Sequence, residues 1–83
     1  MKHATLETLK HLATLLDQLR QLPGLKEKKL GVFYLKSQTF LHFHEDSNDI
    51  YADYKIKGQW VRQKINSPSE WEELLATLKI ILN

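Results

Sequence analysis

The hydrophobic positions of the chain change their spacing near residue 30, from a helical period to a strand-like one. Over residues 5–21, leucines recur at intervals of three and four, which is the spacing of one apolar helix face. Pro23 and Gly24 predict the end of this helix, because proline cannot continue it and glycine accepts a left-handed turn. We expect residues 25–29 to form a short basic connector.

Four strands of alternating polarity are predicted after this connector. Their content of Val, Ile, Phe, Tyr, Trp and Thr suits strands, and the short segments between them indicate consecutive antiparallel pairing. The predicted strands cover residues 30–36, 39–45, 50–57 and 60–65. Gly58 and Gln59 would form the last turn, with glycine at the first position of a type II′ hairpin.

The clearest local signal marks the start of the last helix. Ser67 is a candidate N-cap, Pro68 suits the first helical position, and Glu70 completes a capping box. Apolar residues at helical spacing continue from there to the C-terminus. The order α-β-β-β-β-α predicts a single α+β domain over residues 1–83. We expect a two-layer sandwich, in which a four-stranded antiparallel meander carries the N- and C-terminal helices on one face.

Composition narrows the functional classes. A chain of 83 residues without cysteine allows one domain and excludes disulfides, thiolate metal sites and a cysteine nucleophile. No apolar run suits a signal peptide or a membrane span, so we expect a cytoplasmic protein without membrane contact. The net charge is only +2, but the charges form blocks. Residues 41–54 hold four acidic residues and no Lys or Arg, whereas residues 55–66 hold four Lys or Arg residues and no acidic residue.

Alternation within the strands assigns two faces to the predicted sheet. The apolar face would pack against the helices and comprises Phe33, Leu35, Leu41, Phe43, Ala52, Tyr54, Ile56, Val61 and Ile65. The other face mixes aromatic, histidine and charged side chains, and we take it as the candidate binding face. Its proposed members are Tyr34, Phe40, His42, His44, Tyr51, Asp53, Lys55, Trp60, Arg62 and Lys64. A register error of one residue would exchange the two sets.

The turns also predict which residues of the binding face lie opposite one another. The expected cross-strand pairs are His44–Tyr51, His42–Asp53, Asp53–Lys64 and Lys55–Arg62. These pairs would form a row of hydrogen-bonded side chains from His42 through Asp53 to Lys64. Pairs of opposite charge commonly stabilise sheets, so this row has a purely structural interpretation as well as functional ones.

Two binding functions for this face involve a macromolecule. A homodimer interface, the leading hypothesis, would cover four aromatic side chains that form a large patch for so small a domain: Tyr34, Phe40, Tyr51 and Trp60. A platform for single-stranded nucleic acid would stack bases on the aromatic rings while Lys and Arg contact phosphates. The low net charge and the lack of an RNP-like Lys/Arg-Gly-Phe run argue against the platform.

The main alternative to the homodimer is a metal or small-ligand site built on His42, His44 and Asp53, ahead of the nucleic-acid platform. His42 and His44 project from alternate strand positions to the same side, and Asp53 would supply a third ligand for a divalent ion. We place the remaining histidines, His3 and His11, on the first helix, away from this site. No catalytic constellation is recognisable and no cofactor is implied, which favours a non-enzymatic binding or assembly domain.

Several short strings resemble a family of small bacterial proteins without an assigned activity. They are Phe40-Leu41-His42-Phe43-His44, Tyr51-Ala52-Asp53, Trp60-x-Arg62 and the helix start from Ser67 to Glu70. The resemblance spans residues 30–80 and implies a bacterial, cytoplasmic α+β protein. It implies no catalytic residue.

Overall fold

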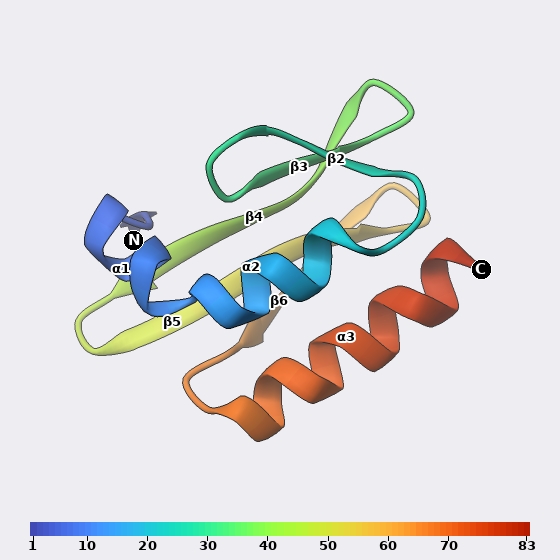
Figure 1. The fold of residues 1–83 in the computed structure, drawn as a ribbon. Helices are drawn as coiled ribbons and strands as arrows, with labels where there is room; N and C mark the ends of the chain where they lie inside the picture. The colour runs from blue at the N-terminus through green and yellow to red at the C-terminus, as the bar shows by residue number, and fades with distance from the viewer.

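Helices from both ends of the chain cover the same face of an antiparallel sheet in the computed structural model, which describes residues 1–83 (Figure 1). The elements in chain order are β1 Lys2–His3, α1 Leu6–His11, α2 Ala13–Arg20, β2 Leu25–Lys29, β3 Val32–Leu35, β4 Gln38–Asp46, β5 Asp49–Ile56, β6 Gln59–Lys64 and α3 Pro68–Leu82. Strands β2 to β6 form a meander, and β1 pairs with β4. The predicted α+β sandwich is confirmed, with more strands than expected.

The predicted connector over residues 25–29 is wrong, because this segment forms the edge strand β2. Leu25 pairs with Leu35 and Lys26 with Tyr34. Leu25 is the single apolar residue of the strand, so no alternation of polarity reveals it in the sequence. Backbone pairing with β3 forms this strand, and its lysines suit an edge position, where they discourage pairing with another chain.

The N-terminal segment also differs from its prediction. The expected helix is two helices, α1 and α2, that meet at Leu12, where φ of −93° and ψ of 13° interrupt the helical backbone. His3 was expected on that helix, but it lies in β1 and pairs with His44 of β4. β4 is longer than β3, so β3 does not reach His44. β1 pairs with this free edge of β4 instead.

The register between β4 and β5 is confirmed, whereas that between β5 and β6 is not. The last turn consists of Lys57 and Gly58, with φ of 51° and 79°, as in a type I′ turn. The expected type II′ turn at residues 58–59 is therefore wrong, and β6 is displaced by two residues. The observed pairs are His44–Tyr51, His42–Asp53, Asp53–Arg62, Lys55–Trp60 and Tyr51–Lys64. The predicted pairs Asp53–Lys64 and Lys55–Arg62 are wrong, but a shift of two residues preserves both faces.

Phe40 is the one predicted member of the binding face that the structure places in the core. The register between β3 and β4 shifts between Phe33 and Tyr34, so β4 carries an extra residue at this point. Such a β-bulge interrupts the alternation of side chains. Phe40 is only 4% exposed and packs in the core beside Leu41.

The core joins the helices to the predicted apolar face of the sheet. Leucines from α1, α2 and α3 pack on fully buried sheet residues that include Phe33, Leu41 and Ala52. The predicted capping box of α3 is present, with Ser67 accepting from the backbone N–H of Glu70. Trp71 donates its indole N–H to the carbonyl of Ile65 at 2.8 Å, which fixes the start of α3 against the end of the sheet.

Two glycines offer a matched test of this packing. Gly31 and Gly58 have φ of +75° and +79°, but a Cβ atom on Gly31 would lie 2.7 Å from Leu9 Cδ2, whereas one on Gly58 meets nothing within 4 Å. We expect Gly58→Ala to lower the free energy of unfolding by about 1–2 kcal/mol, the cost of a left-handed residue. Gly31→Ala should lower the free energy of unfolding by about 1–3 kcal/mol more than Gly58→Ala does, because the added methyl group overpacks the core. Urea titrations of both variants would measure this, and equal losses would contradict it.

Candidate functional site

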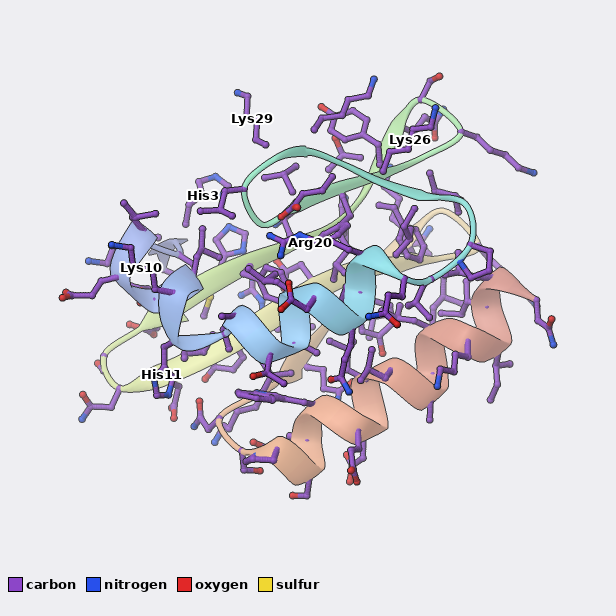
Figure 2. The ribbon with its side chains drawn as sticks, in the orientation of Figure 1. His3, Lys10, His11, Arg20, Lys26 and Lys29 are labelled. Carbon is purple, nitrogen blue, oxygen red and sulfur yellow. The ribbon has the colours of Figure 1, made fainter.

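We call the side of the sheet opposite α2 and α3 the open face. In β2, Lys26 pairs with Tyr34 and shares its side of the sheet. Glu27 instead binds Arg20, which reaches from α2 toward β2 on the helix side (Figure 2). The open face therefore comprises Lys26, Lys28, Lys29, Tyr34, His42, His44, Tyr51, Asp53, Lys55, Trp60, Arg62 and Lys64, together with His3 of β1. Except for Phe40, every residue predicted for the binding face lies on it.

Asp53 is the buried charge at the centre of the open face. Its side chain accepts two hydrogen bonds from Arg62, at 2.7 Å to Oδ1 and 2.8 Å to Oδ2. Burial raises the pKa of Asp53, but the hydrogen bonds and charge of Arg62 outweigh burial, so the pKa lies below its ordinary value. The carboxylate is thus ionised at neutral pH, and both of its oxygens already have a partner.

Three histidines from two strands meet beside this ion pair. The rings of His3 and His44 stack with centroids 4.5 Å apart, and His42 meets His44 edge-on at 4.8 Å. One nitrogen of each ring lies within 4.8 Å of the others. His3 was missed in the sequence because a strand of two residues has no periodicity, and only its pairing with β4 brings it here.

The two strand histidines of this cluster are held in their neutral form. Burial is the main cause that lowers the pKa of His42, and the neighbouring His44 lowers it further. Burial also lowers the pKa of His44, and the carboxylate of Asp53 opposes this effect only in part. Nδ1 of both rings is buried without a hydrogen-bond partner; His44 Nδ1 lies 3.0 Å from Asp53 Oδ2, but without the geometry of a directed hydrogen bond.

The aromatic rings of the open face each lie close to a cation. Lys55 Nζ is 4.9 Å from the ring centroid of Trp60, and Lys28 Nζ is 4.8 Å from that of Tyr34. The guanidinium carbon of Arg62 lies 5.9 Å from the centroid of Tyr51. Such pairs are favourable cation–π contacts. Trp60 stays 47% exposed, so it keeps ring surface for a partner.

The predicted row from His42 through Asp53 to Lys64 is replaced by a different network. Arg62, and not Lys64, lies opposite Asp53 on β6. On β4, Asp53 lies opposite His42, and its carboxylate contacts His44 diagonally across the strands. In the predicted metal set, the two histidines come together, but Asp53 is bound to Arg62. His3 stands on the other side of His44, where a third ligand could come from.

Comparison of the chain with protein-family models, curated proteins and solved structures gave no match. No helix of the structure is long and apolar enough to cross a membrane. The proposed function therefore draws on the geometry of the open face alone.

The ion pair makes a prediction that distinguishes the observed register from the expected one. Arg62→Ala leaves a buried carboxylate without its two hydrogen bonds, so we expect a clear drop in Tm, because an unpaired buried charge is costly. Lys64→Ala removes a cation from the same edge strand without touching Asp53, and its Tm should stay near that of the wild type. Thermal unfolding followed by circular dichroism measures both, and equal losses would count against the Asp53–Arg62 pairing.

The neutral histidines predict an acid-sensitive fold. The folded protein disfavours protonation of His42 and His44, whereas the unfolded chain takes up these protons near pH 6.5. The free energy of unfolding should therefore be fully present above about pH 6.5 and decline as the pH falls below that value. Urea titrations with a chelator present measure this. A His42→Gln, His44→Gln variant should flatten the decline, whereas His11→Gln should keep it; a wild type of constant stability would refute the prediction.

Proposed function

We propose that the chain is a non-enzymatic binding domain whose open face binds single-stranded nucleic acid. The observation that carries the proposal is the segregation of charge. The open face holds six of the chain's twelve lysine and arginine residues, although the net charge is only +2. Among the residues that define the open face, the one acid is Asp53, which Arg62 neutralises. Asp46 and Asp49 lie on the same side of the sheet, at the β4–β5 turn. Six cations against three carboxylates leave this side of the sheet with a net charge of +3, above the +2 of the whole chain.

The cations follow the two edges of the sheet. Lys26, Lys28 and Lys29 lie along β2, and Arg62 and Lys64 lie along β6. Figure 2 shows Lys26 and Lys29 on the side of the molecule away from α3. The two rows lie on the outermost of five adjacent strands. Four interstrand spacings of about 4.8 Å therefore place the rows about 19 Å apart. Lysine and arginine rows of this kind meet phosphates without regard to sequence, and they release bound counterions when they do.

The rings between these rows supply the second part of the proposed mechanism. Tyr34, Tyr51 and Trp60 alternate with the cations on the same face. Aromatic side chains on an open sheet stack unpaired bases, and neighbouring cations then contact the backbone phosphates. Trp60 is the best placed of the three because it is the most exposed and adjoins Lys55. Stacking requires unpaired bases, so we propose single strands as the ligand.

Homodimerisation through the same face was the leading hypothesis from the sequence and is the alternative to nucleic-acid binding. The burial of Phe40 removes one of the four aromatic side chains that motivated it. An isologous interface would also press two copies of the basic surface together, and such contacts between like charges are costly. The other large exposed apolar side chains lie outside the strands of the open face: Met1, Leu6, Leu30 and Ile80. A polyanion complements this surface better than a second copy does.

Fluorescence anisotropy with a labelled single-stranded oligonucleotide tests the proposal. Trp60→Ala should weaken binding about 5- to 150-fold, the range equivalent to one stacked base at 1–3 kcal/mol. Lys64→Ala should lower the slope of log K against log salt by about 1, because one phosphate contact is lost. The control is Lys10→Ala on the outer side of α1, which should leave both quantities unchanged (Figure 2).

Two further measurements decide between this proposal and its alternatives. If inorganic polyphosphate competes as well as RNA of equal charge and Trp60→Ala has no effect, the rings take no part and the nucleic-acid proposal fails. Light scattering coupled to size-exclusion chromatography addresses the dimer. A wild-type dimer that Trp60→Ala converts into a folded monomer would place the open face in a homodimer interface instead.

A further inference from the structure

We propose that His3, His42 and His44 together form a binding site for a divalent transition metal ion, with Zn²⁺ as its best-suited occupant. The site joins the N-terminal strand β1 to the central strand β4. It goes beyond the nucleic-acid function proposed above and does not depend on it. The ion would sit at the end of the open face where β1 continues the sheet beside β4.

The geometry of the three rings is close to that of a metal site. One nitrogen of each lies within 4.8 Å of the others, whereas zinc bonds of 2.0–2.1 Å in a tetrahedral site bring ligand nitrogens to about 3.4 Å. Closing this difference requires ring movements of about 1 Å. His42 and His44 are held in β4, and His3 is exposed on a strand of two residues, so His3 is free to make the adjustment.

A second observation is that the cluster has unused ligand atoms. Nδ1 of His42 is buried and has no hydrogen-bond partner. Nδ1 of His44 faces Asp53 Oδ2 at 3.0 Å, so the other ring nitrogen, Nε2, is the ligand atom that His44 offers. Buried polar atoms without partners are rare in folded proteins, and binding an ion is one way to satisfy them. Ring contacts with His3 and His44 leave the buried nitrogen of His42 unsatisfied, whereas a bound cation would satisfy it.

Asp53 contacts the proposed site through His44. Its Oδ2 lies 3.0 Å from His44 Nδ1, and Arg62 holds the carboxylate in place. A carboxylate behind a histidine orients the ring and strengthens its other nitrogen as a ligand, an arrangement that recurs in zinc proteins. The negative charge of Asp53 also offsets the charge of Arg62, which would otherwise repel a cation.

The ligand set selects the class of metal. Three imidazoles without a thiolate suit Zn²⁺, Cu²⁺ and Ni²⁺, whereas Mg²⁺ and Ca²⁺ require oxygen ligands. Three protein ligands also leave a fourth position for water or for an anionic group of a ligand.

Isothermal titration of Zn²⁺ into the untagged chain of 83 residues tests the site directly. We expect saturable binding of one ion per chain, with affinity reduced by about 100-fold or more in His3→Ala, beyond what loss of an outer-shell group causes. His3→Ala is the decisive variant, because its exposed side chain is not needed for the core. The matched control is His11→Ala, whose histidine lies on α1 apart from the cluster and should bind zinc like the wild type (Figure 2).

Cobalt provides a readout of geometry that weak surface binding does not give. Co²⁺ in the wild-type chain should show the intense visible absorption of a four-coordinate site, and His3→Ala, His42→Ala and His44→Ala should each lose it. Because the last two variants remove buried rings, their circular dichroism spectra must first show that they fold. Absence of saturable zinc binding in the wild type, or equal affinity in wild type and His3→Ala, would overturn the proposal.

Discussion

The open face is organised around one ion pair, between the buried Asp53 and the half-exposed Arg62. A carboxylate that is 6% exposed has to be hydrogen-bonded, because an unpaired buried charge costs more than the sheet gains from closing over it. Arg62 meets this requirement with two hydrogen bonds across β5 and β6. The same carboxylate lies against His44 on the other side. The pair therefore links the register of the last hairpin to the position of the histidine cluster.

The length of β4 accounts for the second organising feature. β3 pairs with only the first part of this strand, so residues near His44 are left without a neighbour on that side, and β1 takes the vacant edge. Closer to its start, β4 carries the bulge that turns Phe40 into the core. One strand thus makes the core larger at one end and assembles three histidines at the other.

The two proposals place different chemistry on one surface. Lysines and arginine at the sheet edges attract polyanions over a distance of about a Debye length, whereas the histidine cluster offers neutral nitrogen ligands at short range. The positive potential that favours nucleic acid also works against a metal ion. Asp53 reduces this conflict locally, because its charge lies between Arg62 and His44. A metal with an open position could in turn bind a phosphate oxygen, so the two functions are chemically compatible.

The sequence alone determined the features that depend on local spacing. Leucine periodicity gave the helix faces, the S-x-x-E box located the start of α3 at Ser67, and alternation assigned the two faces, since these signals lie within a few consecutive residues. Four features needed the tertiary structure: strand β2, the place of His3, the Asp53–Arg62 register and the burial of Phe40. Each depends on backbone pairing with a neighbouring strand, which supplies hydrogen bonds that no local pattern of side chains encodes.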